Sequence, residues 1–208
     1  MELKRLPLFY SDVFVYEDIG TDEQREDLKK QILHAKENKI GEVGGSNPNC
    51  WRSDAKYDCE WLHDAIYKLS DEVNNIYFES EPIYKVLLEK CTNRDFNYWT
   101  NVNETGSNNI FHSHYRADAD LSGVYYVQGA NTGLIRFATH EQMYRMIPNH
   151  MPHANMIAHQ PSDGDILCFP SYLLHDVDIN RSNRQRITIA FNAKIKCLIF
   201  PGKFHLNK

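Results

Sequence analysis

The sequence predicts an α+β fold with a mainly β core, in which a helical N-terminal layer packs on a sandwich or barrel of short strands. Residues 1–95 carry apolar side chains mostly at helical spacing. From about residue 96 the pattern changes to short apolar runs separated by turn signals. The 12 tyrosines and 10 phenylalanines suit a β-rich core. A chain of 208 residues can bury one substantial core, so we expect a single domain over 1–208, with 1–95 as helical support and 96–197 as the β core.

Two long helices and one short helix are expected in the N-terminal layer. The first begins at Thr21, which forms a capping box with Gln24 and so satisfies free N–H groups of the first turn. The second covers about 58–78, where the apolar residues form one stripe. A third, short helix begins near Ser80. The segment 41–54, rich in Gly and Asn, has no regular period and is predicted to be a loop.

Short strands with turns between them are predicted for the rest of the chain, and their regular spacing is typical of a sandwich or barrel. They are expected at 8–10, 13–15, 96–102, 110–114, 121–127, 133–138, 165–169, 174–177 and 186–195. The segment 140–159 is rich in Met, Pro and His and has no clear period. We interpret it as a long insertion over one mouth of the barrel, where long loops are usually functional.

Charge and hydropathy exclude several classes of protein. The formal net charge is -5 and no basic tract stands out, so a nucleic-acid partner is not expected. No apolar run approaches the roughly 20 residues that span a bilayer, and the N-terminus lacks the features of a secretory signal. The five cysteines are widely spaced, so neither a disulfide framework nor a zinc site built from thiolates is expected. Reduced thiols in a cytoplasm are the simplest interpretation. We therefore expect a cytoplasmic protein without a membrane partner; the sequence gives no indication of its oligomeric state.

Three histidines stand at defined places on the predicted strands. His112 and His114 are separated by one residue, and residues i and i+2 of a strand point to the same face. Such a pair inside a barrel presents two ring nitrogens to one point, although an isolated H-x-H is more often a surface or hydrogen-bonded pair. His175, which follows an apolar strand and a turn, adds a third imidazole. The three together predict a metal site.

Arg186 opens a strand in which polar and apolar residues alternate. Arg186, Thr188, Ala190 and Asn192 share one face of this strand, and Ile187, Ile189 and Phe191 share the other. A guanidinium at the head of so apolar a strand is costly inside a protein unless an anion pairs with it. The alternative is an arginine at the strand end that points into solvent.

The order of these residues resembles the 2-oxoglutarate/Fe(II)-dependent oxygenase superfamily, in which H-x-D is followed by a distal histidine and, about ten residues later, an arginine. The resemblance covers roughly 96–195, including Trp99–Gly106 and Leu121–Val127, and extends weakly to Trp51–Asp54. Within this superfamily the sequence is similar to the oxygenases of tailed bacteriophages and marine bacteria, which are distant relatives of prolyl 4-hydroxylases. The resemblance implies a double-stranded β-helix (jelly roll) and, for a phage protein, location in the host cytoplasm.

The same resemblance implies the metal ligands. His112 matches the first ligand and His175 the distal one, with His114 in place of the usual carboxylate. Asp118 and Asp120 in the following loop are the alternative third ligands. A neutral imidazole would leave the iron one unit of charge more positive than a carboxylate, which a bound oxoacid dianion could offset.

The cofactor contacts are implied in the same way. Arg186 matches the residue that binds the far carboxylate of 2-oxoglutarate, where an arginine offers bidentate geometry. Tyr126 matches a tyrosine whose hydroxyl helps to hold that carboxylate. Thr188, on the same strand face, and Asn101, on the preceding strand, are further candidate contacts.

The implied activity is hydroxylation or a related oxidation that uses Fe(II), 2-oxoglutarate and O2 and releases succinate. The resemblance does not determine the substrate, which could be a peptide side chain, a small metabolite or a sugar. Two other interpretations of the same residues remain. One is a cupin-type three-histidine metalloenzyme that does not use 2-oxoglutarate, and the other is a non-catalytic binding module on the same fold.

Overall fold

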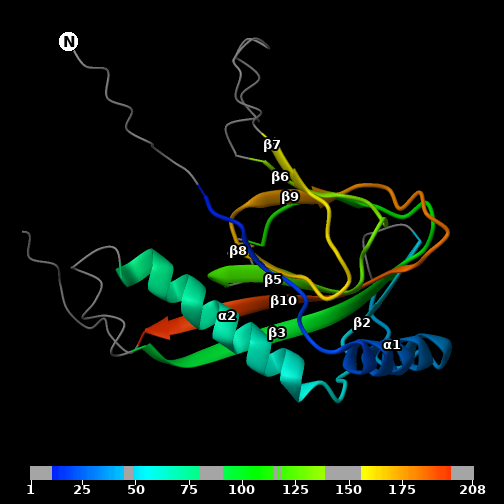
Figure 1. The fold of residues 1–208 in the computed structure, drawn as a ribbon, viewed down its shortest axis with the longest axis horizontal. Coiled ribbons are helices and arrows are strands. Elements are labelled where there is room, and N and C mark those ends of the chain that lie inside the picture. Colours follow the sequence, from blue (N-terminus) through cyan, green and yellow to red (C-terminus); the bar gives the residue numbers. More distant parts are fainter. Residues whose placement is uncertain are drawn as a thin grey trace, which may run out of the picture.

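A computed structural model describes residues 11–44, 49–79, 91–114, 117, 119–138 and 156–197, and Figure 1 shows their arrangement. The elements among these residues are, in chain order, β1 (Phe14–Tyr16), α1 (Asp22–Glu37), β2 (Cys50–Ser53), α2 (Glu60–Glu79), β3 (Cys91–Asn103), β4 (Asn109–His112), β5 (Leu121–Gln128), β6 (Ile135–Ala138), β7 (Met156–His159), β8 (Ile166–Pro170), β9 (Leu174–Val177) and β10 (Arg186–Cys197).

The strands form two antiparallel sheets that face each other. The major sheet has the order β1-β8-β5-β10-β3-β2, and the minor sheet has the order β4-β9-β6-β7. From β3 onward the chain passes from one sheet to the other after each strand, except at β6 and β7, which pair as neighbours. This winding is the jelly roll, or double-stranded β-helix, that the sequence predicted.

The helical layer covers the outer face of the major sheet. The predicted capping box of α1 is present, because Thr21 Oγ1 accepts from the Gln24 backbone while the Gln24 side chain accepts from the Thr21 backbone. In α2, buried Leu62, Ile66 and Val73 recur at helical spacing and belong to the core cluster between helices and sheet. Figure 1 shows α2 along β5, β10 and β3, on the side away from the minor sheet. No helix within the described ranges is long and apolar enough to cross a bilayer.

β10 lies in the middle of the major sheet and divides two environments. It pairs with β3 on one side and with β5 on the other. Ile187, Ile189 and Phe191 are buried in the core beneath the helices, whereas the alternate residues line the space between the sheets. The alternation read from the sequence therefore describes this strand correctly. A second apolar cluster lies inside the barrel and contains Tyr126, Ile135, Phe137, Leu167, Phe169, Leu173 and Val177.

Two strands were missed by the sequence analysis. β2 lies in the segment 41–54, which was predicted to be a loop, and β7 lies at the end of the predicted insertion 140–159. Both are four-residue edge strands without apolar alternation, and their pairing is supplied by β3 and β6. The strand predicted at 8–10 and the helix predicted near Ser80 lie outside the described residues, as does most of the predicted insertion.

Candidate metal centre

A cavity of about 590 Å³ opens between the two sheets. Its wall on the major sheet is built from the side chains that alternate inward along neighbouring strands. Strand register places Arg52 opposite Asn101, Asn101 opposite Thr188, and Thr188 opposite Tyr126, so that these four residues form one row across β2, β3, β10 and β5. All four line the cavity. Among the described residues that line it there is no Asp or Glu.

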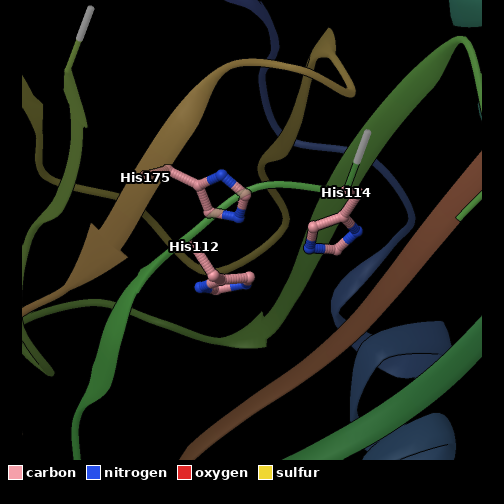
Figure 2. Close-up of side chains that lie close together, drawn as sticks. All are labelled: His112, His114 and His175. Carbon is pink, nitrogen blue, oxygen red and sulfur yellow. The ribbon is translucent and has the colours of Figure 1, made fainter. Parts of the chain in front are cut away.

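The three histidines converge at one end of this cavity. His112 on β4 and His175 on β9 are direct cross-strand partners, and His114 follows two residues after the end of β4. One potential ligand atom from each side chain lies within 4.8 Å of those from the other two. Figure 2 shows the three rings turned toward a common space. The local chain course differs from the prediction in one respect, because β4 ends at His112 and the H-x-H pair is not wholly on a strand.

Each imidazole is oriented by a hydrogen bond from its Nδ1 atom. His112 Nδ1 lies 2.8 Å from the carbonyl oxygen of Ile110, and His175 Nδ1 lies 2.9 Å from that of Leu173. His114 Nδ1 lies 2.7 Å from the side-chain oxygen of Asn192. Because these oxygens only accept, each Nδ1 carries the proton and each Nε2 keeps its lone pair for a metal ion. Ligand histidines in metal sites are held by this kind of outer contact.

Burial keeps two of the rings in the neutral form that binds a metal. Burial, assisted by nearby His112, lowers the pKa of His175 to about 3. Burial also lowers the pKa of His114, although its hydrogen bond with Asn192 acts in the opposite direction. A metal ion therefore meets little competition from protons at these two rings near neutral pH.

The alternative carboxylate ligands have a different placement. Asp120 is exposed and is not among the residues that line the cavity. Its backbone N–H donates to Ala193 and its carbonyl accepts from Ser171. Asp118 lies outside the described residues. Within the described part of the chain, the residues grouped for a metal ion are the three histidines alone.

Arg186 lies at the start of β10, where the cavity meets the connections between the sheets. It is only 2 % exposed. Its Nη1 donates to the carbonyl oxygens of Thr132 and Asp178, at 2.9 and 3.2 Å. Its Nη2 is buried and has no hydrogen-bond partner among the described residues. Burial lowers the pKa of this guanidinium, although the charge of nearby Asp178 acts in the opposite direction.

Tyr126 completes the surroundings of Arg186. The side chain is buried, and burial raises the pKa of its hydroxyl well above the usual range, while the positive charge of Arg186 acts against this shift. The phenol is therefore neutral near pH 7 and can donate a hydrogen bond. A buried cation with a free N–H group, next to a neutral hydroxyl, is a fitting site for a carboxylate.

Three polar or aromatic residues that line the cavity make contacts in the site although they were not predicted as site residues. Asn192 was placed on the correct face of its strand, but only the tertiary structure brings it to His114. Arg52 and Trp99 were quoted only within the family resemblance. In the structure the guanidinium carbon of Arg52 lies 4.7 Å from the centre of the Trp99 ring, and both residues line the cavity. Their proximity depends on the pairing of β2 with β3.

Comparisons with known proteins find a matching family model and solved structures with a similar fold. A sequence model of the family described as "Putative 2OG-Fe(II) oxygenase" matches residues 97–192. A search of curated proteins finds no match. The crystal structure of a Pseudomonas putida prolyl-4-hydroxylase has a TM-score of 0.60 at 13 % identity, over 88 % of this chain and 92 % of that chain.

Two further solved structures have the same fold. A prolyl hydroxylase from Trichoplax adhaerens, in complex with a peptide fragment of the hypoxia inducible factor oxygen degradation domain, has a TM-score of 0.56 at 13 % identity, over 88 % of this chain and 83 % of that chain. HygX from Streptomyces hygroscopicus, with nickel, 2-oxoglutarate and hygromycin B bound, has a TM-score of 0.51 at 9 % identity, over 89 % of this chain and 83 % of that chain. At these identities the likeness shows a shared fold.

Proposed function

We propose that this protein, which its family match and jelly-roll fold support as a member of the 2OG-Fe(II) oxygenase superfamily, is a 2-oxoglutarate-dependent dioxygenase that hydroxylates or otherwise oxidises its substrate. The observation that carries the proposal is one cavity that holds three imidazoles with free Nε2 atoms and a buried guanidinium that forms no ion pair with the described residues. Fe(II), when bound, would allow O2 to react as the oxidant, and 2-oxoglutarate would supply two electrons as it is converted to succinate and CO2, so that one oxygen atom enters succinate and the other oxidises the substrate.

The residues of the chain have separate tasks in this proposal. His112, His114 and His175 would hold the iron on one face and leave positions on the other face for the co-substrate and oxygen. Arg186 would bind the far carboxylate of 2-oxoglutarate through its free Nη2, with the Tyr126 hydroxyl beside it. Thr188 and Asn101 lie in the same row as Tyr126 and would contact the length of the co-substrate.

The burial of these groups bears on how the co-substrate would bind. Because Arg186 and Tyr126 are both buried, 2-oxoglutarate must displace water from the interior of the barrel when it binds. The bound co-substrate would then fill the space between Arg186 and the histidines. The substrate would occupy the part of the cavity that the co-substrate leaves open.

The direct test of the proposal is spectroscopic. Fe(II) and then 2-oxoglutarate are added to the protein without oxygen, and the visible charge-transfer band of the chelate is recorded. We expect the band for the wild-type protein and its loss in His175→Ala. Folded wild-type protein that gives no band would contradict the proposal.

The choice of third ligand is tested by a pair of variants. His114→Ala should lose Fe(II) affinity by more than about a hundredfold, since even changes to outer contacts of a metal site cost roughly 10- to 100-fold. Asp120→Ala should bind iron as the wild type does, because Asp120 does not line the cavity. Affinities are measured by anaerobic competition with a coloured chelator. The reverse result would assign the ligand to Asp120.

Arg186 separates the proposal from the cupin-type alternative. Arg186→Met should weaken 2-oxoglutarate binding by roughly 10- to 100-fold, because a hydrogen bond to a charged group contributes about 1.5–3 kcal/mol. Arg186→Lys keeps the positive charge but not the guanidinium. Its comparison with Arg186→Met therefore separates the effect of losing the charge from the effect of losing the hydrogen bonds to Thr132 and Asp178. Metal-dependent activity that needs no oxoacid and survives both changes would favour the cupin-type enzyme. Wild-type protein that binds iron and oxoacid but makes no succinate with any substrate would favour the binding module.

A further inference from the structure

A second arginine enters the cavity from the edge of the major sheet. Arg52 on β2 is the cross-strand partner of Asn101 on β3, so both side chains are on the sheet face that lines the cavity. The guanidinium carbon lies 4.7 Å from the centre of the Trp99 ring, which holds it by a cation–π contact. Its charge is close enough to His114 to contribute to the lowered pKa of that ring.

Arg52 has no anionic partner in the described part of the chain. Its Nε atom is buried and has no hydrogen-bond partner there, and no described carboxylate forms an ion pair with its guanidinium. Two other arginines of the described residues do form ion pairs: Arg136 binds Asp176 and Asp178, and Arg184 binds Asp163. A half-buried cation with a free donor and no counter-charge is costly unless a ligand supplies the anion.

The co-substrate of the proposed function does not supply enough negative charge for both arginines. The two charges of 2-oxoglutarate balance those of Fe(II), because the three histidines are neutral and bring none. Arg186 and Arg52 then remain positive in a cavity whose described lining contains no carboxylate. This count already includes His114 as a neutral ligand in place of the usual carboxylate. The loaded cavity is therefore electrostatically suited to a further anion.

We propose that Arg52 recognises the anionic group of the primary substrate, which we infer is a small molecule that carries a carboxylate or a phosphate. This inference rests on the proposed function and adds the substrate class to it. Arg52 lies in the same row as Asn101, Thr188 and Tyr126 but at the edge strand, so an anion bound there would sit beside the co-substrate rather than in its place. A cavity of about 590 Å³ is within the size range of small-molecule sites.

The test uses two simple anions and one neutral analogue. Protein loaded with Mn(II) and 2-oxoglutarate is titrated with acetate, methylphosphonate and acetamide, and binding is followed by tryptophan fluorescence, because Trp99 lies against Arg52. We expect at least one of the two anions to bind and acetamide to bind at least tenfold more weakly. The anion that binds more tightly indicates whether the substrate carries a carboxylate or a phosphate.

Three variants assign the binding to Arg52. Arg52→Met should weaken the binding of whichever anion binds more tightly to the wild type by at least tenfold, and Arg52→Lys should retain part of that affinity. Arg181→Met is the matched control, since Arg181 is exposed and does not line the cavity, and it should titrate as the wild type does. Circular dichroism checks that each variant is folded. Equal anion binding by wild type and Arg52→Met, or acetamide binding as strong as acetate binding, would overturn the inference.

The binding of 2-oxoglutarate is measured first, in wild type and Arg52→Met, by calorimetry with Mn(II). Failure of the wild type to bind it contradicts the proposed function. Normal binding in both proteins, followed by anion titrations that do not depend on Arg52, contradicts only the assignment of the substrate class. The two failures are therefore distinguishable.

Discussion

At the scale of single residues, one amide oxygen orients the third imidazole. Asn192 Oδ1 accepts from His114 Nδ1 at 2.7 Å and from the hydroxyl of Ser122 at 2.7 Å. Ser122 is fully buried and bonds to Ser171 as well, so the amide cannot turn without breaking several contacts. His114 stands two residues beyond its strand, where its backbone is held by Ser171 and Ala117, and the hydrogen bond of its ring is made to Asn192. Its ring therefore depends on Asn192 for its direction.

We expect Asn192→Ala to weaken Fe(II) or Mn(II) binding by about 10- to 100-fold, the usual effect of removing an outer contact to a ligand histidine. Asn192→Asp keeps an acceptor oxygen and should retain most of the affinity. The measurement is anaerobic competition with a chelator. The exposed Asn183 provides a control through Asn183→Ala. Wild-type affinity in Asn192→Ala would mean that His114 is positioned by other contacts or is not a ligand.

At the scale of elements, the central strands pack closely enough to exclude a methyl group. A Cβ atom at Gly123 of β5 would lie 2.5 Å from the carbonyl oxygen of Leu167 and 2.7 Å from Cε1 of Phe191. Phe191 is itself fully buried on β10, and Leu167 lies on β8. The glycine thus allows the Phe191 ring to cross over β5 while β5 pairs on both sides.

Gly123→Ala should lower the free energy of unfolding by about 1–3 kcal/mol, because neither a strand backbone nor a buried ring can move away cheaply. Gly44→Ala is the matched control, since a Cβ there would meet nothing within 4 Å. Urea denaturation followed by circular dichroism compares the two variants with the wild type. If both variants had the stability of the wild type, the close packing of β5 and β10 described above would be wrong.

At the scale of the whole molecule, the connections between the sheets are tied together at one end of the barrel. Asp163, between β7 and β8, accepts from the backbone N–H groups of Gly129 and Ala130, between β5 and β6, at 2.7 and 2.8 Å. It also pairs with Arg184, between β9 and β10, at 3.0 Å. Arg186 joins the same connections through Thr132 and Asp178. The end of the cavity proposed for the far carboxylate of 2-oxoglutarate is therefore a fixed structure.

The Asp163 contacts predict a pH-dependent contribution to stability. Burial raises the pKa of Asp163, but the two backbone bonds and Arg184 outweigh it, so the pKa is lowered from 3.8. The unfolded state then binds the proton more readily, and the stabilisation is present above about pH 3.8 and is lost as the pH falls through the lowered value.

Asp163→Asn should cost about 1 kcal/mol at pH 7, a small figure because the side chain is partly exposed to solvent. The difference from the wild type should begin to shrink as the pH falls below about 3.8 and should vanish below the lowered pKa of Asp163, where the wild-type carboxyl is neutral as well. Urea denaturation at several pH values provides the measurement, with Glu17→Gln at an exposed site as control. A difference that stays constant with pH would show that the charge of Asp163 is not responsible.

The elements with a strong internal period could be predicted from the sequence by itself. The capping box and apolar stripes determined α1 and α2, and the alternation along β10 correctly separated the core face from the cavity face. These signals are local, since a helix or a central strand must present one apolar face whatever its partners are. The jelly roll could be expected from the number and spacing of the strands together with the family resemblance.

Only the tertiary structure decided which contacts Arg52 and Asn192 make in the cavity. β2 and β7 are short edge strands, held by the free hydrogen-bonding groups of β3 and β6 rather than by their own pattern, so their sequences carried no signal. For that reason Arg52 was not recognised as a cavity residue. The contact between His114 and Asn192 joins residues 78 positions apart, and no spacing rule predicts it. Local periodicity can be predicted from the sequence because neighbouring residues determine it. Contacts between distant residues depend on how the two sheets pack around the cavity, which only the tertiary structure gives.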